Sequence, residues 1–114
     1  PRLCAAARSH AEEMVQTGRF DHINRAGIGP DERVCLAAFP LPGAGRTSNS
    51  IESFYYAWPN PPTSSAVTFF QNSQGHRNHI LGGGIHSRQT AIGVGFANNP
   101  ASTISTFVFI NQFV

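Results

Sequence analysis

The sequence contains no lysine, few charged residues and no acidic residue in its second half. Only 12% of the 114 residues are charged, about half the share in an average soluble domain. The absence of lysine excludes covalent catalysis through a side-chain amine. The six acidic residues all precede residue 53, so Arg77 and Arg88 account for the formal net charge of +2. Two scattered arginines do not form a basic stripe, and we expect no nucleic-acid partner.

The sequence also lacks a long apolar run. No stretch approaches the roughly 20 apolar residues that a transmembrane helix needs, so we expect a chain that does not span a membrane. A chain of 114 residues buries roughly two-thirds of the surface that its unfolded form exposes. One core is then sufficient, and we expect a single domain over residues 1–114.

Cysteine is rare, with Cys4 and Cys35 as the two instances. A disulfide between them would close a loop of about 30 residues and contribute about 3–4 kcal/mol in the chain-entropy account. It would also indicate an oxidising compartment. The alternative is two buried thiols, and we expect the disulfide.

Two helices are expected in the first third of the chain. From Leu3 to Thr17 the apolar residues recur at the spacing of an amphipathic helix, and Gly18 ends it. Further on, Pro30 stands at a first helical position and is followed by two acids that favour the helix dipole. This predicts a short second helix in the segment that ends at Phe39, from which Cys35 can reach the first helix.

The middle of the chain alternates aromatic residues with helix breakers. Residues 51–58 are rich in aromatics and are compatible with a strand or with a buried turn of helix. Three prolines then interrupt regular structure. Thr63 or Ser64 caps a short helix that ends just before Ser73.

A second short helix follows at once. Ser73 is a good N-cap, and Gly82 to Gly84 end the helix after Leu81. His76 and His79 lie three positions apart, on one helical face. That spacing is compatible with metal ligation, but without an acidic partner nearby in the sequence it is more often a surface or capping feature.

The C-terminal part predicts an antiparallel hairpin. Residues 91–97 alternate apolar residues with glycine, and a glycine face lets another backbone or a helix approach closely. Residues 98–100 form the turn. The segment from Ile104 to Val114 has strong strand propensity.

Four segments of the chain, in order, resemble one known family. They are Ala5-Ala6-Ala7-Arg8-Ser9-His10-Ala11-Glu12-Glu13-Met14-Val15, Arg19-Phe20-Asp21-His22, Asn72-Ser73-Gln74-Gly75-His76-Arg77-Asn78-His79-Ile80-Leu81 and Ile92-Gly93-Val94-Gly95-Phe96-Ala97. Together they are similar to the CAP superfamily, or SCP-like domain, which includes cysteine-rich secretory proteins, antigen 5 and pathogenesis-related proteins, and most similar to its bacterial branch. The resemblance implies an α+β fold, a three-layer α-β-α sandwich with a cleft that holds two histidines and a glutamate.

Carried over to this chain, the resemblance assigns the cleft to named residues. His22 matches the histidine after the first helix, and His76 matches the histidine of the Ser-Pro-Gly-His motif, although Gln74 replaces its proline. Glu52 is the best match for the glutamate, with Asn49 as the alternative. Asn49 and His79 are also candidates for the lining of the cleft.

Two imidazoles and a carboxylate are groups that bind a divalent transition metal such as Zn. A metal held by His22 and His76 would acidify a bound water, and Glu52 could take its proton. The three side chains would then be catalytic. Without a metal, the same groups could form a structural polar network.

The family's fold does not decide its function, so two functions stay open. One is an exported monomeric binding module for a lipid, a cell-wall fragment or a protein, secreted, periplasmic or at the cell surface. The other is a metal-dependent hydrolase of a peptide, ester or cell-wall substrate. A serine hydrolase is disfavoured because the chain has no Gly-x-Ser-x-Gly elbow.

Overall fold

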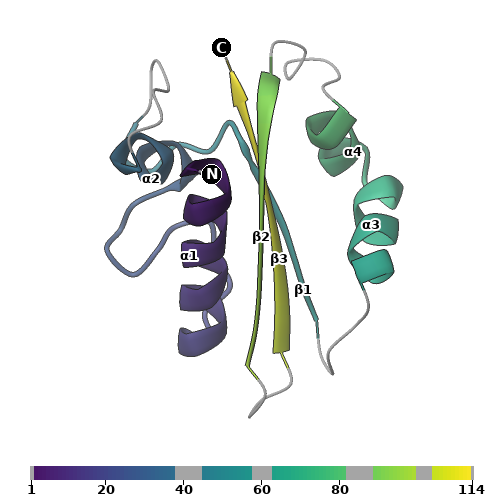
Figure 1. Cartoon of the computed structure of the whole chain (residues 1–114), viewed down its shortest axis with the longest axis horizontal. Helices are drawn as coiled ribbons and strands as arrows, with labels where there is room; N and C mark the ends of the chain where they lie inside the picture. Colours follow the sequence, from purple (N-terminus) through teal and green to yellow (C-terminus); the bar gives the residue numbers. More distant parts are fainter. Residues whose placement is uncertain (1, 38–44, 58–62, 82–88, 100–103, 114) are drawn as a thin grey trace.

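The computed structural model describes residues 2–37, 45–57, 63–81, 89–99 and 104–113. Within these residues the chain forms helices and strands in the order α1 (Arg2–Thr17), α2 (Pro30–Leu36), β1 (Glu52–Ala57), α3 (Thr63–Asn72), α4 (Gln74–Leu81), β2 (Gln89–Asn99) and β3 (Ile104–Phe113). Helices α1 and α2 lie on one side of the strands, and α3 and α4 lie on the other (Figure 1).

The strands form one antiparallel sheet in the order β1-β3-β2. β2 and β3 form the predicted C-terminal antiparallel pair, but Asn98 and Asn99, expected in the turn, still belong to β2 and pair with Ser105 and Ile104. β1 pairs with the other side of β3, with Glu52 opposite Ile110. Residues 51–58 were ambiguous because aromatic residues suit both a strand and a buried helix. Residues 52–57 pair with β3 and form a strand. Trp58 lies outside the described residues.

Helix α1 packs against β2 and β3. Its buried apolar stripe is the predicted one, and its largest member, Met14, is almost fully buried. The glycines of β2 allow this contact: a β-carbon at Gly93 would collide with the backbone of Leu3, and one at Gly95 with the backbone of Arg8. The helix ends at Gly18, which has a φ of 69°, a conformation that glycine adopts without strain.

Helices α3 and α4 pack on the side of β1 that faces away from α1. Phe70 of α3 is buried and contacts Tyr55 of β1. The ring of Phe69 lies 5.0 Å from that of Tyr55. Ser73 separates the two helices, and the glycines expected to end α4 lie outside the described residues. Successive side chains of β1 point to opposite faces, so this strand contributes to both layers.

Helix α2 is the short helix expected before residue 40. It begins at Pro30, as predicted, and ends at Leu36, and residues 38 and 39 lie outside the described residues. Val34 is fully buried in the core. Asp31 is buried as well, and its carboxylate accepts hydrogen bonds of 2.9 Å from the backbone N–H and the hydroxyl of Ser50. This anchors α2 to the segment before β1.

The structure shows no disulfide between Cys4 and Cys35, so the disulfide stays a prediction. Cys4 lies on the exposed side of α1, next to the buried Leu3, whereas Cys35 packs against the core. The two side chains thus lie in different environments. The structure gives no support for an oxidising compartment from this pair.

Candidate functional site

The carboxylate of Glu52 is the centre of a buried polar network at the start of β1. Its side chain has no exposed surface. Nδ1 of His22 lies 2.7 Å from Oε1. Nη2 of Arg33, on α2, donates to Oε1 at 3.1 Å and to Oε2 at 2.9 Å. Both carboxylate oxygens therefore have partners, from two segments that lie before β1 in the chain.

The partners of Glu52 keep it ionised. Burial by itself raises the pKa of this carboxyl, but the hydrogen bond from His22 and the positive charge of Arg33 outweigh burial. The net pKa is below the ordinary value of 4.5. Since an ionised carboxylate only accepts hydrogen bonds, Nδ1 of His22 is the donor. Glu52 is therefore an anion at neutral pH and a poor general acid.

This contact sets the tautomer of His22. With the proton on Nδ1, neutral His22 presents the lone pair of Nε2. The side chain is 37% exposed, and its ring lies 4.7 Å from the ring of Phe54, edge to face. The backbone oxygen of His22 also accepts a hydrogen bond of 2.8 Å from Nη2 of Arg33. His22 is thus held at its ring and at its backbone, with one ring nitrogen left for a ligand or a proton.

The side chain of Asn49, the alternative candidate for the glutamate position, hydrogen-bonds to the backbone at the start of β1. Its Oδ1 accepts hydrogen bonds from the backbone N–H groups of Ile51 and Glu52, and its Nδ2 donates to the backbone oxygen of Glu52. These bonds shape the turn that leads into β1. Of the two residues considered for the glutamate position, Glu52 is the one that contacts His22.

His76 lies in the other layer, on α4. Its Nδ1 is 2.9 Å from the hydroxyl of Ser73, and its ring lies 5.3 Å from that of Phe69 and 5.4 Å from that of Phe70. Burial lowers its pKa, and the positive charge of His22 lowers it further. His76 is therefore close enough to His22 to feel its charge, although each ring belongs to its own hydrogen-bond network.

His79 is a buried contact between α4 and β1. Its Nδ1 lies 2.6 Å from the hydroxyl of Ser53, and both residues are only 3% exposed. Ser53 and Glu52 are adjacent in β1 and so face opposite layers. His79 joins α4 to the sheet and does not lie beside Glu52.

The arrangement does not suit a three-ligand metal site. Among the residues that the structure describes, no group of three or more His, Cys, Asp or Glu side chains could hold a metal ion. Glu52 uses both oxygens on Arg33 and His22, and the Nδ1 atoms of His22 and His76 are hydrogen-bonded to Glu52 and Ser73. The expectation of Zn or another divalent metal at His22 and His76 stays a prediction, as does catalysis by these residues with Glu52.

Two buried residues were not predicted from the sequence: Arg33, which binds Glu52, and His10, whose charge interacts with that of Glu52. Arg33 is the cation that balances Glu52. His10, on α1, is 3% exposed, and its Nε2 lies 2.7 Å from the backbone oxygen of Asp21. For His10 the signal is its place three residues after Ala7 and four before Met14, within the buried face of α1; no local pattern marks Arg33.

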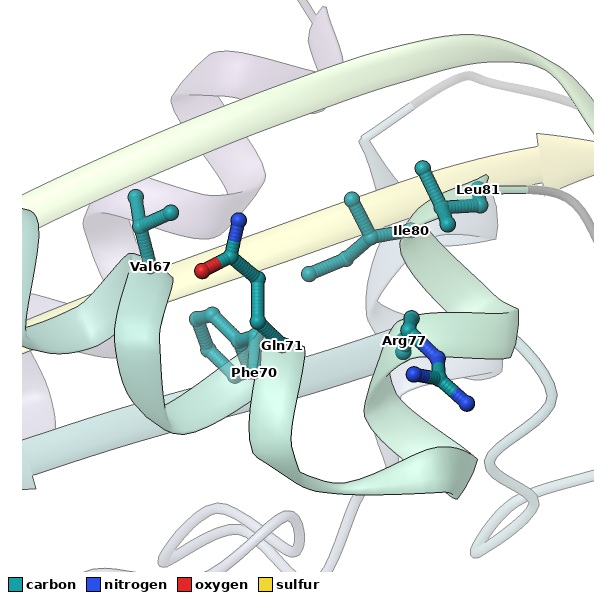
Figure 2. Close-up of a pocket in the computed structure, with 6 residues that line it drawn as sticks. All are labelled: Val67, Phe70, Gln71, Arg77, Ile80 and Leu81. Carbon is teal, nitrogen blue, oxygen red and sulfur yellow. The ribbon is translucent and has the colours of Figure 1, made fainter.

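A second feature is an apolar cavity of about 470 Å³ between α3 and α4 (Figure 2). It is lined by Val67, Phe70 and Gln71 of α3 and by Arg77, Ile80 and Leu81 of α4. Figure 2 shows side chains of the two helices meeting over the sheet. Phe70 also contacts His76, so it lies between this cavity and that histidine.

The layered arrangement is similar to that of a solved structure, an extracellular protein containing a SCP domain from Bacillus anthracis str. Ames. The match covers 97% of this chain with a TM-score of 0.60 and 18% sequence identity. The chain has an SCP-like fold. At this identity the likeness concerns the fold alone.

This chain spans only 32% of the solved chain's length, so the likeness is to one part of a larger protein. No family model matches the sequence, and no curated protein matches it. Within the described residues, no helix is long and apolar enough to cross a membrane.

Proposed function

We propose that the chain is an exported domain of the CAP type that binds a lipid in the cavity between α3 and α4. In this proposal the helices and the sheet are the layers of the α-β-α sandwich, and the domain works as a secreted, periplasmic or cell-surface monomer. The SCP-like fold supports the CAP assignment. The observation that carries the ligand assignment is the apolar cavity.

The size and lining of the cavity suit an acyl chain. Its volume of about 470 Å³ falls within the usual range for small-molecule sites, about 300–1,000 Å³. Most of the side chains around it are hydrocarbon, and Leu81 and Val67 are 76% and 43% exposed. Covering such exposed apolar side chains with an acyl chain is favourable by about 25 cal/mol per Å² of apolar surface buried.

The charge near the cavity suits an anionic head group. Arg77 contributes to the lining, and residues 53–114 contain no acidic residue. An acidic side chain that would compete with a carboxylate or phosphate for Arg77 is therefore absent from this half of the sequence. We infer an amphiphile, a fatty acid or phospholipid, as the ligand.

The network around Glu52 supports this binding role better than hydrolysis. Both oxygens of the Glu52 carboxylate accept hydrogen bonds, and the side chain has no exposed surface. Such a carboxylate is suited to holding His22 and α2 in place. A metal-dependent hydrolase would instead need a carboxylate free to accept a proton from a bound water. Stoichiometric zinc binding together with ester or peptide hydrolysis, both lost in His76→Ala, would select that alternative.

The test is the displacement of cis-parinaric acid, a fluorescent fatty acid, from the protein by unlabelled fatty acids and phospholipids. Leu81→Glu places an anion beside the cavity at a position that is 76% exposed, so we expect the variant to fold. We expect affinity to fall about tenfold or more, which corresponds to about 1.4 kcal/mol.

The matched control is Ile92→Glu on β2, where an apolar residue that is 53% exposed lies outside the cavity lining. We expect it to bind cis-parinaric acid like the unmodified protein. The proposal fails if the unmodified protein does not bind the probe, or if both variants lose affinity equally.

A further inference from the structure

Strand β2 carries a row of exposed apolar side chains on the face that points away from α1. Its glycines face α1, because a β-carbon at Gly93 or Gly95 would collide with that helix. Successive side chains of a strand point to opposite faces, so Ile92, Val94 and Phe96 point to the side of the sheet on which α3 and α4 lie (Figure 1). They are 53%, 44% and 46% exposed. We call this row of three side chains the β2 strip.

Helices α3 and α4 cover the other part of the same sheet face. Both helices pack on β1, and α4 also packs on β3, whereas β2 lies at the opposite edge of the sheet from β1. In Figure 2 the side chains of Val67 and Ile80 extend from the helices toward the part of the sheet where β2 lies. The cavity between α3 and α4 and the β2 strip therefore belong to one side of the molecule.

The exposed apolar side chains of the described residues are concentrated on this side. Helices α1 and α2 contribute one large exposed apolar side chain within the described ranges, that of Leu36. The elements α3, α4 and β2 contribute Val67, Phe69, Leu81, Ile92, Val94 and Phe96. Apolar side chains that gather on one face in this way mark an interaction site, whereas singly scattered ones do not.

The charge on this side suits an anionic lipid surface. The sequences of α3, α4 and β2 contain Arg77 and no acidic residue. The acidic residues of the helices lie on the opposite side of the sheet, on α1 and α2. Electrostatic attraction to anionic lipids adds to the binding that buried apolar area provides at a membrane surface. An anionic surface that approaches these elements would meet a guanidinium and none of their side chains would repel it.

The β2 strip suits a bilayer better than the surface of another protein. A protein interface typically carries about ten direct hydrogen bonds, and the side chains of Ile92, Val94 and Phe96 contain no donor or acceptor. The hydrocarbon of a bilayer requires none. A lipid that enters the cavity must also leave a membrane, and a membrane held at the β2 strip would lie on the side of the cavity.

We propose that the β2 strip docks the domain on the surface of a membrane that contains anionic phospholipids. Ile92, Val94 and Phe96 insert among the lipids, and Arg77 faces their head groups. This inference rests on the proposed function, because it places the docking surface on the side where the lipid cavity lies. It adds the source of the ligand, which is the membrane that the strip contacts.

The experiment is co-sedimentation of the intact chain with vesicles made of equal parts phosphatidylcholine and phosphatidylglycerol. We expect binding, and we expect Ile92→Glu to weaken it about tenfold or more, because this variant places an anion in the row. Val94→Glu, at the next position of the strip, should have the same effect and guards against a folding defect in one variant. Vesicles of phosphatidylcholine alone should bind the unmodified chain less tightly, and equal binding to both would overturn the anionic assignment.

The matched control is Leu36→Glu. It introduces the same side chain at a position that is 67% exposed, on α2 and therefore on the other side of the sheet. This variant should bind vesicles like the unmodified protein. An equal loss in Leu36→Glu and in the strip variants would overturn the proposal, as would an unmodified chain that does not sediment with the vesicles.

Binding of cis-parinaric acid separates this inference from the lipid cavity. Ile92→Glu should still bind the probe, because residue 92 lies outside the cavity lining. Probe binding by the unmodified chain without vesicle binding overturns the docking and leaves the cavity assignment intact, whereas loss of probe binding overturns the cavity assignment. Self-association that Ile92→Glu abolishes, without vesicle binding, would assign the strip to a second copy of the chain and would also overturn the proposal.

Discussion

Nδ1 of His22 lies 2.7 Å from Oε1 of Glu52, although the two residues are 30 positions apart in the chain. The contact joins the loop after α1 to the first residue of β1. Arg33 binds the same carboxylate and the backbone oxygen of His22. Three segments that are distant in the sequence thus meet at one buried carboxylate. We therefore expect substitution of Glu52 to destabilise the fold strongly.

Glu52→Gln should destabilise the protein strongly. It removes the negative charge that balances the buried guanidinium of Arg33, and breaking a buried pair from one side costs about 3–5 kcal/mol. Urea denaturation followed by circular dichroism measures the free energy of unfolding. Glu12→Gln, at an exposed position of α1, is the control and should change it by no more than about 0.5 kcal/mol. Equal effects of the two substitutions would contradict the central role of Glu52.

Acid should destabilise the protein through Glu52. Because its pKa in the folded state is below the ordinary value of 4.5, the unfolded chain takes up the proton first as the pH falls. The stabilisation is complete above that ordinary value and is lost as the pH falls through the lowered pKa. Urea unfolding measured between about pH 3 and pH 7 should show this decline, and Glu52→Gln should reduce it. A decline of the same size in the variant would assign the acid sensitivity to other groups.

His10 should add a second pH dependence at higher pH. Burial lowers its pKa below the ordinary value of 6.5, so the unfolded chain binds a proton there before the folded chain does. The free energy of unfolding should therefore begin to fall once the pH drops below about 6.5. In His10→Gln the decline that starts there should be smaller. An unchanged slope between about pH 5 and pH 7 would show that His10 titrates alike in both states.

Two glycine substitutions should have opposite signs. A β-carbon at Gly95 would meet the backbone of α1, and overpacking of this kind costs about 1–3 kcal/mol, so Gly95→Ala should destabilise. A β-carbon at Gly75, in α4, has no atom within 4 Å, so Gly75→Ala should stabilise by about 0.5–1 kcal/mol. Thermal unfolding midpoints compare the two. Destabilisation by Gly75→Ala would mean that α4 packs differently.

The two thiols should differ in reactivity. Cys4 is exposed, whereas Cys35 packs against the core. In the native protein a thiol reagent such as DTNB should modify Cys4 rapidly and Cys35 more slowly, and both should react after unfolding without a reductant. Intact mass after alkylation under non-reducing conditions provides a second measurement. Two unreactive cysteines in the unfolded protein would show that the disulfide forms after all.

The helices and strands were largely predictable because each has a local signal. The apolar spacing of α1, the proline at the start of α2 and the alternating glycines of β2 act within a few residues. The ends of α2 and the state of residues 51–57 were less predictable. Helix ends depend on what the last turn contacts, and a run of aromatic residues becomes a strand only when a partner such as β3 supplies its hydrogen bonds.

The sequence by itself determined the types of the elements other than β1, the glycine face that admits α1, and His22 and Glu52 as candidates for one site. Only the tertiary structure decided that Arg33 balances Glu52 and that His76 and His79 belong to the other layer. The physical reason is that a buried charge is stabilised by whichever groups the fold brings within hydrogen-bond distance. Which groups come that close depends on how the helices pack against the sheet. A local pattern of residues does not predict this packing.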